Sequence, residues 1–432
     1  MRFIDLFAGI GGFHQALESL GHTCVFASEK KENLAKLYFK NYGIEVNRNI
    51  RRINPYEIPD HEILCGGFPC QPFSKAGNQK GLFDPNNGSF FDIIVEILRV
   101  KQPNYFILEN VRNLESHDEY RTWNYILERL EELGYSVDKK VMSPHQYNIP
   151  QHRERLFIVG SRSGLDHFNW PLEEKKTLSI HNFLNESNPK LVEEEKLKVI
   201  DVWQEFISVL PKNKKLPGFP IWATEFGATY PVKEIATNRL SSAELDSFKG
   251  SFGIELKGLS LKDKHNNLPP YSLNSKTERF PNWKIRYIEQ NRKLYEENKT
   301  VLDPIVSKIK EFPIFSWQKF EWNCGELPRD LYKYIIQFRA SGVRIKNNDF
   351  FPSLVTVSTQ IPIIGWQKRY LSPAEGAAIQ SFEKLYLPEN LGSSFGALGN
   401  AVNVKLVRLI ANNLLNVDIQ HENTNIKYLE II

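Results

Sequence analysis

Cysteine is scarce in this chain, which holds four cysteines among its 432 residues. Cys24, Cys65, Cys70 and Cys324 are irregularly spaced, and no Cys-x-x-Cys or Cys/His pattern occurs. The sequence therefore excludes a disulfide-stapled fold and predicts no metal site. We expect reduced thiols, so that any of the four could take part in chemistry.

The chain also lacks long apolar runs and a strong charge of one sign. No apolar stretch approaches the roughly 18 residues that span a bilayer, and the N-terminus has no basic segment followed by an apolar core. Lys and Arg total 55 against 51 Asp and Glu, a net charge of +4 that permits a polyanionic partner without requiring one. The hydrophobic share of 41% excludes a disordered or low-complexity chain. We expect a cytoplasmic protein with no membrane partner.

The N-terminal part of the chain, up to residue 160, alternates β-rich runs with helical periodicity. This alternation is typical of βαβ units, in which helices cover both faces of a parallel sheet. Strands are expected at residues 2–7, 23–28, 62–65, 104–108, 135–142 and 155–160, and helices at residues 12–20, 32–42, 90–100 and 121–133.

The character of the sequence changes near Asp166. Beyond it apolar runs become irregular and proline and aromatic residues are frequent, whereas helical periodicity returns at residues 371–382 and 400–415. We therefore expect an α/β nucleotide-binding fold that carries a smaller inserted domain of mixed α and β structure. The expected boundaries are residues 1–165 plus 390–432 for the first domain and 166–389 for the insertion.

A glycine-rich turn follows the first predicted strand and leads into a helix. The turn is formed by Asp5-Leu6-Phe7-Ala8-Gly9-Ile10-Gly11-Gly12, and glycines there let the backbone turn tightly against a ligand. Glu29 follows the second predicted strand, where an acid can bind both hydroxyls of a ribose, and Phe7 can stack on an adenine. The pattern predicts an adenosine-type cofactor, although the glycine spacing differs from the G-x-G-x-x-G of dinucleotide folds.

A second motif, Gly66-Gly67-Phe68-Pro69-Cys70-Gln71-Pro72-Phe73-Ser74, follows another apolar strand. Cys70 then lies beyond the carboxyl end of that strand, at the edge where parallel sheets bind ligands. Cys24 and Cys65 lie within apolar strands and are expected to be inert. We predict that Cys70 is a nucleophile and that residues 75–88, rich in Gly, Asn, Lys and Ser, form a mobile lid.

Charged residues at two further strand ends complete the predicted site. Glu109 ends the strand at 104–108, on the same sheet edge as Cys70, and is predicted to be a catalytic acid. Arg153 and Arg155 precede the strand at 156–160, and their spacing of two predicts that both guanidinium groups point to one side. We expect this pair to meet an anionic or carbonyl-rich partner.

These motifs give the chain a resemblance to the DNA cytosine-C5 methyltransferases of bacterial restriction-modification systems. Six blocks occur in that family's order and cover most of residues 1–160 and 369–411. The resemblance implies a Rossmann-like methyltransferase sheet with a target-recognition domain as the insertion. In this sequence the blocks are DLFAGIGGF (Asp5 to Phe13), GGFPCQPFS (Gly66 to Ser74), ENV (Glu109 to Val111), QHRER (Gln151 to Arg155), RYLSPAEGAAIQSF (Arg369 to Phe382) and GNAV (Gly399 to Val402).

The resemblance implies S-adenosyl-L-methionine as cofactor and double-stranded DNA as substrate. Cys70 would add to carbon 6 of a flipped-out cytosine, and Glu109 would bind ring nitrogen 3 and the exocyclic amine. Arg155 would contact the cytosine carbonyl, and Arg153 would brace Glu109 or a backbone phosphate. The implied cofactor contacts are Phe7, Ala8, Gly9, Ile10, Gly11, Glu29, Asn49, Ile50, Pro69 and Asn400.

Two positions depart from the family pattern. Asn49 stands where family members carry an acid, and its side-chain oxygen can still accept a hydrogen bond from an adenine. Lys30 follows Glu29 where an aromatic residue is common, which changes one wall of the adenine pocket. We expect cofactor binding to survive the change at Asn49.

Sequence specificity is expected from major-groove contacts made by the inserted domain. Lys214 and Lys215 are candidates for phosphate contact, and Ser353-Leu354 takes the place of the family's common Thr-Leu. A cognate restriction endonuclease is expected as a functional partner without required contact, and the protein is expected to be a monomer. The candidates for DNA contact are Ser74, Arg339, Arg344, Ser353 and Gln360.

Three alternatives stay open from the sequence. A tRNA cytosine methyltransferase would share the catalytic blocks, although an insertion of about 200 residues favours DNA. A DNA-binding regulator without activity is disfavoured by the presence of Cys70, Glu109 and Arg155. An NAD-dependent oxidoreductase is disfavoured by the glycine spacing of the first turn.

Overall fold

The computed structural model describes residues 1–47, 49–69, 90–174, 178–185, 187–275 and 277–415. The chain divides into two compact units. Unit 1 comprises Met1–Asn188, Asp349–Ser358 and Ser372–Ile432, and unit 2 comprises Pro189–Asn348 and Thr359–Leu371.

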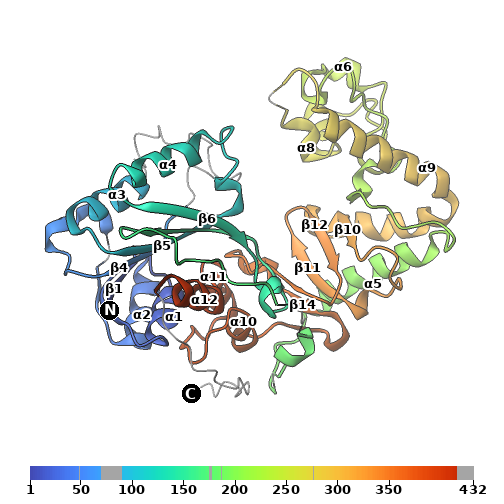
Figure 1. The fold of residues 1–432 in the computed structure, drawn as a ribbon. Helices are drawn as coiled ribbons and strands as arrows, with labels where there is room; N and C mark the ends of the chain where they lie inside the picture. Colours follow the sequence, from blue (N-terminus) through green and yellow to red (C-terminus); the bar gives the residue numbers. More distant parts are fainter. Residues whose placement is uncertain (48, 70–89, 175–177, 186, 276, 416–432) are drawn as a thin grey trace. The chain divides into compact units, whose positions relative to one another are not determined.

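Unit 1 is built on a seven-stranded sheet (Figure 1). Its strands are β1 (Arg2–Leu6), β2 (Thr23–Ser28), β3 (Val46–Asn47), β4 (Ile63–Gly67), β5 (Tyr105–Val111), β6 (Ser136–Met142) and β8 (Arg155–Ser161), in the order β3-β2-β1-β4-β5-β8-β6. The first five strands pair in parallel, as the βαβ pattern predicts. β8 runs antiparallel to β5 and β6, which corrects the expectation of a wholly parallel sheet. No α-helix separates β6 from β8, and parallel neighbours need such a crossover.

Helices cover both faces of this sheet. On one face lie α1 (Gly12–Glu18), α2 (Glu32–Tyr42) and α12 (Val404–Leu415), and on the other lie α3 (Phe90–Lys101) and α4 (Arg121–Glu131). α12 begins at Val404 rather than at Asn400 as expected, because the side chain of Asn403 accepts a hydrogen bond from Leu406 and caps the helix. Helices α3 and α4 bury apolar residues at helical spacing against the strands, among them Phe91, Ile94, Leu98, Trp123, Ile126 and Leu130.

The boundary of unit 1 differs from the expected one. Residues 166–188 and 372–389, expected in the inserted domain, belong to unit 1. Residues 372–389 belong to unit 1 because α10 (Pro373–Ile379) packs on α11 (Leu391–Leu398). A Cβ on Gly376 of α10 would lie 3.0 Å from the nearest side-chain atom of α11, so the two helices approach closely.

A short parallel pair joins two distant segments of unit 1. β13 (Phe351–Pro352) pairs with β7 (Gln151–His152), and the backbone N–H of Phe351 donates to the carbonyl of Pro150 at 2.7 Å. Residues 349–358 therefore lie beside the chain that leads into β8, about two hundred positions earlier in the sequence.

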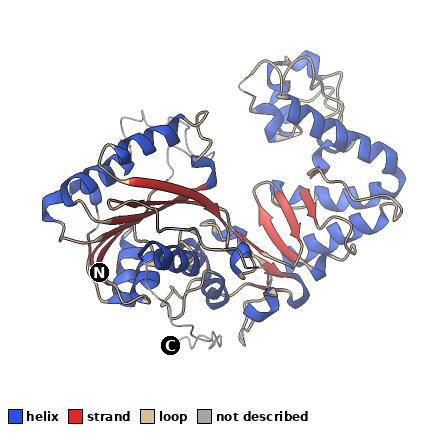
Figure 2. Cartoon of the chain, in the orientation of Figure 1, coloured by secondary structure: helices blue, strands red, loops and turns tan. Residues whose placement is uncertain are grey.

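Unit 2 combines a six-stranded sheet with helices, the mixed α and β character that the sequence predicts (Figure 2). Trp203 on one long helix stacks on Phe320 of the sheet, with ring centroids 5.0 Å apart. No helix that the structure describes has both the length and the hydropathy needed to cross a membrane. The strands, in sheet order, are β15 (Arg369–Tyr370), β14 (Ile363–Ile364), β11 (Ile335–Arg339), β12 (Gly342–Lys346), β10 (Lys319–Asn323) and β9 (Ile221–Trp222). The helices are α5 (Glu194–Val209), α6 (Ser242–Leu245), α7 (Leu261–Asn266), α8 (Pro270–Leu273) and α9 (Asn282–Lys310).

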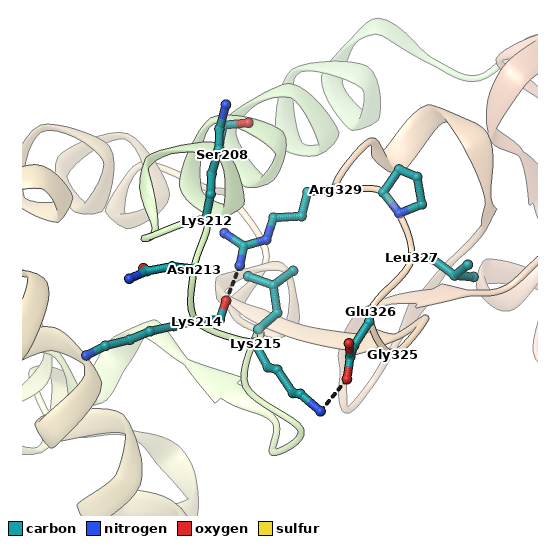
Figure 3. A pocket seen from close by; sticks show the side chains of 11 residues that line it. Ser208, Lys212, Asn213, Lys214, Lys215, Gly325, Glu326, Leu327 and Arg329 are labelled. Atoms are coloured by element: carbon teal, nitrogen blue, oxygen red, sulfur yellow. Dashed lines mark hydrogen bonds and ion pairs between the residues drawn. The ribbon is translucent and has the colours of Figure 1, made fainter.

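A hollow of about 710 Å³ lies on unit 2 (Figure 3). The guanidinium of Arg329 donates to the carbonyls of Leu210 and Pro211, at 2.9 and 3.1 Å, and so fixes the loop that borders the hollow. Lys215 forms an ion pair with Glu326 across it. The lining is rich in cations and includes Lys212, Lys214, Lys215 and Arg329.

Candidate active site

The glycine-rich turn lies between β1 and α1, as the sequence predicts. Phe7, Gly9 and Gly11 all have positive φ angles, of 57°, 57° and 82°. This left-handed geometry is costly for residues with a Cβ and explains two glycines in the turn. A Cβ on Gly9 would meet no atom within 4 Å, so space for a ligand lies open beside the turn.

Glu29 holds this turn from the end of β2. Its Oε2 accepts a hydrogen bond from the backbone N–H of Gly9 at 3.0 Å, and its Oε1 accepts one from Lys31 at 2.8 Å. The residue is 9% exposed, so this carboxylate is nearly buried beside the turn. Each carboxylate oxygen has a further acceptor site, so Glu29 can still receive the hydroxyls of a ribose.

The other predicted cofactor residues differ in what they can offer. Ala8, Ile10 and Ile50 are buried in the hydrophobic interior, so only their backbone could face a ligand. The ring of Phe7 is half-buried and meets Phe90 edge to face, at 5.3 Å between centroids. The remaining three residues keep polar or exposed surface: Asn49, whose Oδ1 accepts a hydrogen bond from the backbone of Arg51, and the exposed Pro69 and Asn400.

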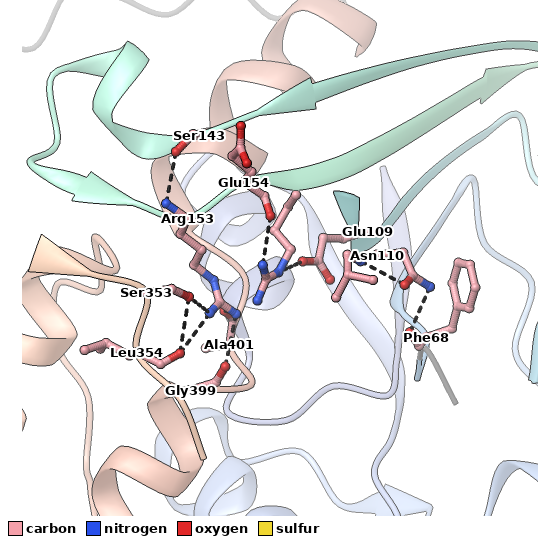
Figure 4. Close-up of polar contacts among 12 residues, drawn as sticks. Phe68, Glu109, Asn110, Ser143, Arg153, Glu154, Ser353, Leu354, Gly399 and Ala401 are labelled. Carbon is pink, nitrogen blue, oxygen red and sulfur yellow. Dashed lines mark hydrogen bonds and ion pairs between the residues drawn. The ribbon is translucent and has the colours of Figure 1, made fainter. Parts of the chain in front are cut away.

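The ends of β4 and β5 lie side by side at the sheet edge. Gly67 pairs in register with Glu109, and a Cβ on Gly67 would lie 3.3 Å from the Oε2 atom of Glu109. The side chain of Asn110, itself 2% exposed, donates to the carbonyl of Phe68 at 3.2 Å (Figure 4). Asn110 thus fixes the backbone that leads toward the cysteine motif, a role that the sequence analysis missed. The predicted nucleophile Cys70, Ser74 and the lid at 75–88 lie outside the described residues.

Arg155, rather than Arg153, is the partner of Glu109. The Nε atom of Arg155 lies 2.8 Å from Oε1 of Glu109, and its Nη1 donates to the carbonyl of Glu154 at 2.8 Å. The side chains of Glu109 and Arg155 are 12% and 21% exposed, so the pair is partly desolvated and still accessible. This pairing corrects the expectation that Arg153 braces Glu109 (Figure 4).

Arg153 is buried and turned toward other segments of unit 1. Its guanidinium donates four hydrogen bonds, and none of the described hydrogen bonds or ion pairs joins it to Glu109. Burial, together with the charge of Arg155, lowers the pKa of Arg153 to about 9. Side chains two residues apart point to the same side only within an extended strand. Arg153 lies before β8, which begins at Arg155, so the spacing of two does not predict its direction. The acceptors are Ser353 Oγ and the carbonyls of Leu354, Gly399 and Ala401, at 3.0 to 3.1 Å.

A buried polar cluster beneath the glycine turn was also missed by the sequence analysis. Asp5 of β1 is fully buried, and the hydroxyl of Tyr38 donates to its Oδ2 at 3.3 Å. His14 of α1 lies 2.6 Å from the same hydroxyl through Nδ1. Burial raises the pKa of Asp5 to about 8 and lowers the pKa of His14 to about 4. The available signal was an Asp within an otherwise apolar strand.

The predicted DNA contacts do not gather in one unit. Arg344 on β12 of unit 2 forms an ion pair with Glu321 of β10, at 2.5 Å. Gln360, also in unit 2, accepts a hydrogen bond at its backbone carbonyl from the side chain of Gln337. Ser353 belongs to unit 1, where it accepts a hydrogen bond from Arg153.

Comparison with known proteins gives a family match along most of the chain. Residues 1–416 match the family model described as C-5 cytosine-specific DNA methylase. The type II methyltransferase M.HhaI of Haemophilus parahaemolyticus is 42% identical over 188 residues, which are 43% of this chain and 56% of that protein. The likeness thus spans about half the length of that relative. M.AluI of Cellulosimicrobium cellulans is 28% identical over 483 aligned residues, covering 94% of this chain and 90% of that protein.

Solved structures show the same fold. The methyltransferase EhMeth of Entamoeba histolytica has a TM-score of 0.51 at 15% identity, covering 96% of this chain and 98% of that one. A DNMT2 mutant of Spodoptera frugiperda has a TM-score of 0.50 at 16% identity, covering 96% and 99%. The chain therefore has the α/β methyltransferase fold that its sequence predicts.

Proposed function

The chain belongs to the family of C-5 cytosine-specific DNA methylases, and we propose that it methylates carbon 5 of a cytosine within a specific DNA sequence. The observation that carries this proposal is the pairing of Glu109 with Arg155 beside Gly67, at the sheet edge that leads to Cys70. An acid and a fixed cation at one edge, with Cys70 three residues after Gly67 in the sequence, match the needs of cytosine chemistry.

Cytosine carbon 5 becomes nucleophilic only after a nucleophile has added to carbon 6. We assign this addition to the thiolate of Cys70, which follows Gly67 by three residues in the sequence. Glu109 would donate a proton to ring nitrogen 3 as negative charge develops there. After methyl transfer, loss of the carbon 5 proton and elimination of the thiol would release 5-methylcytosine.

Arg155 has two roles in this proposal. Its Nε keeps the carboxyl group of Glu109 in one orientation, and its Nη1 is bound to the carbonyl of Glu154. No described residue accepts a hydrogen bond from its Nη2. We assign this donor to the cytosine carbonyl oxygen, because a guanidinium can serve two acceptors in fixed geometry.

The cofactor site would lie at the glycine turn of unit 1. S-adenosyl-L-methionine, when bound, supplies an electrophilic methyl group. Glu29 would accept hydrogen bonds from the ribose hydroxyls, Phe7 would contact the adenine, and the open space beside Gly9 would admit the ligand next to the backbone. Asn49 would receive the adenine amino group at its side-chain oxygen.

The substrate we propose is double-stranded DNA from which the target cytosine is flipped, since a stacked base is inaccessible to this chemistry. Unit 2 would read the sequence, and the product would be host DNA protected from a cognate restriction endonuclease. That endonuclease acts on the same sequence and need not contact the methylase. We propose a monomer, because one chain holds all the proposed site residues. We also propose that the protein acts in the cytoplasm.

Bisulfite sequencing of plasmid DNA tests this function. Cells expressing the wild-type chain should carry 5-methylcytosine at one recurring sequence, whereas cells expressing Cys70→Ser or Glu109→Gln should carry none. The exposed Arg99→Lys variant, whose ion pair with Glu96 lies within α3 and outside the proposed site, serves as the control and should methylate normally. Unmethylated plasmid together with methylated cellular RNA would overturn the DNA assignment in favour of an RNA substrate.

A further inference from the structure

One buried guanidinium joins two segments that lie far apart in the sequence. The Nη1 atom of Arg153 donates to Ser353 Oγ and to the carbonyl of Leu354, both at 3.1 Å. Its Nη2 donates to the carbonyls of Gly399 and Ala401, at 3.1 and 3.0 Å. Figure 4 shows the side chain between these two groups of acceptors, and all of these residues belong to unit 1.

A second contact joins the same two segments independently of Arg153. A Cβ on Gly399 would lie 2.5 Å from the carbonyl carbon of Val355 and 2.7 Å from the backbone nitrogen of Thr356. A Cβ on Gly392, one helix earlier, would lie 2.8 Å from Cβ of Ser358. The backbone of residues 355–358 therefore runs directly against glycine positions, so the two segments pack closely there as well.

The two segments carry different predicted contacts. Asn400, exposed between Gly399 and Ala401, is a predicted cofactor contact, and Ser353 is a predicted DNA contact. We propose that Arg153 is a positioning residue that couples cofactor binding to DNA binding, because its two terminal nitrogens fix the cofactor segment and the DNA segment at once. This inference rests on the proposed function and on the contacts predicted from the sequence for Asn400 and Ser353.

The physical basis is shared ordering of one hydrogen-bonded unit. A ligand that immobilises residues 399–401 also immobilises the guanidinium, so the second ligand finds residues 353–354 already ordered and loses less conformational entropy on binding. Coupling of this kind is reciprocal, and each ligand raises the affinity for the other by the same factor. The burial of Arg153 favours this role over phosphate contact, since the residue is 3% exposed.

The test is a binding cycle on the full chain. The Kd for cognate duplex DNA is measured without cofactor and with saturating S-adenosylhomocysteine, which permits no turnover. We expect a wild-type ratio within the range of about 5- to 150-fold that is typical of such coupling. In Arg153→Lys, whose ammonium cannot serve both pairs of acceptors, the ratio should fall below the wild-type value, because only the packing of Gly399 against Val355 and Thr356 still joins the segments. The surface variant Arg99→Lys should keep the wild-type ratio.

A second variant keeps the test informative if burying a lysine prevents Arg153→Lys from folding. Ser353→Ala keeps Arg153 and its three carbonyl acceptors. It removes the bond from Arg153 and the 3.4 Å bond that the hydroxyl donates to the Leu354 carbonyl, so it should fold and show an intermediate ratio. A Ser353→Ala variant whose DNA affinity falls equally with and without the cofactor analogue would overturn the coupling role.

The outcomes also separate this inference from the function on which it rests. Wild-type protein that binds both ligands with a ratio of one, or a ratio that Arg153→Lys leaves unchanged in folded protein, would refute the coupling alone. Wild-type protein that binds neither ligand would refute both proposals.

Discussion

The ring of Tyr42 fills the space that a side chain on Gly11 would need. A Cβ on Gly11 would lie 2.2 Å from Cε2 of that ring, and the Tyr42 hydroxyl donates to the carbonyls of Ile10 and Gly11, at 3.0 and 3.2 Å. The ring also stacks on His14, with centroids 4.0 Å apart. The last residue of α2 thus supports the glycine turn from below.

The substitution Gly11→Ala should therefore displace the turn. The new Cβ meets the ring of Tyr42 and requires a positive φ of 82°, so we expect a loss of unfolding free energy of about 2–5 kcal/mol, the sum of overpacking and backbone strain. Gly21→Ala is the matched control, because its φ is 78° but its Cβ would meet no atom within 4 Å. It should lose only about 1–2 kcal/mol in chemical denaturation. Equal losses in both variants would contradict the role of Tyr42.

Glu29→Gln should weaken cofactor binding more than folding. The variant keeps the size of the side chain but directs an amide N–H₂ at one of two backbone donors, Gly9 or Lys31, and removes the charge that would hold the ribose. Hydrogen bonds to charged groups contribute about 1.5–3 kcal/mol, so the calorimetric Kd for S-adenosylmethionine should rise about 10- to 150-fold. Glu18→Gln, at an exposed position of α1, should leave this Kd unchanged.

Only Cys70 should be trapped by DNA that contains 5-fluorocytosine at the target position. Fluorine takes the place of the carbon 5 proton whose loss would complete the reaction. The thioether between Cys70 and the DNA should therefore persist and be visible on a denaturing gel. Cys65 is fully buried in β4, and burial raises the pKa of Cys24 to about 12, so neither supplies an accessible thiolate near neutral pH. Cys70→Ser should abolish the adduct, whereas Cys24→Ser should retain it. An adduct that survives in Cys70→Ser would refute the assignment.

The titration of Asp5 should lower the free energy of unfolding as the pH rises. The folded pKa of about 8 exceeds the unfolded value of about 3.9, so the native state keeps a proton that the unfolded chain loses. His14, with a folded pKa of about 4, opposes this trend below about pH 6.5, because it is neutral when folded and charged when unfolded. The effect of Asp5 is therefore clearest between about pH 6.5 and 8, where one proton is worth about 2 kcal/mol at most.

Thermal unfolding of Asp5→Asn checks this sign. The wild-type Tm should fall between pH 6.5 and 8, and the variant should lose most of that fall because its buried amide does not titrate. Asp60→Asn, at an exposed position, should keep the wild-type dependence. A wild-type Tm that rises across this window would show that Asp5 is ionised in the folded protein.

Two substitutions in unit 2 should separate base reading from phosphate contact. Arg344 is held by Glu321, so Arg344→Gln should cost about 1–3 kcal/mol on cognate DNA and relax the preference at one base pair. Lys214, whose Nζ lies 4.0 Å from Glu297, is exposed. Lys214→Ala should weaken binding to all DNA sequences alike. It should also reduce the slope of log K against log salt concentration by about 0.9. Salt-dependent binding to cognate and non-cognate duplexes distinguishes the two, and Lys36→Ala on α2 is the control.

Much of unit 1 was predictable from local patterns. The helices at α2 and α4 begin where their apolar periodicity begins, and the acid Glu29 follows its strand as expected, because these features depend on residues a few positions apart. The family was also predictable, since six ordered blocks carry it. The roles of Cys70, Ser74 and the 75–88 lid stay predictions, because they lie outside the described residues.

The sequence by itself determined the strand and helix alternation and the glycine turn with its acid, and it supplied the candidate reactive side chains, because each is encoded by neighbouring residues. The tertiary structure alone decided that β8 runs antiparallel, that Arg155 rather than Arg153 holds Glu109, and that Ser353 lies in unit 1. Arg153 and Ser353 are 200 positions apart, and Arg153 and Ala401 are 248 apart. Contacts over such separations arise from how complete layers pack, and no local spacing of residues specifies them.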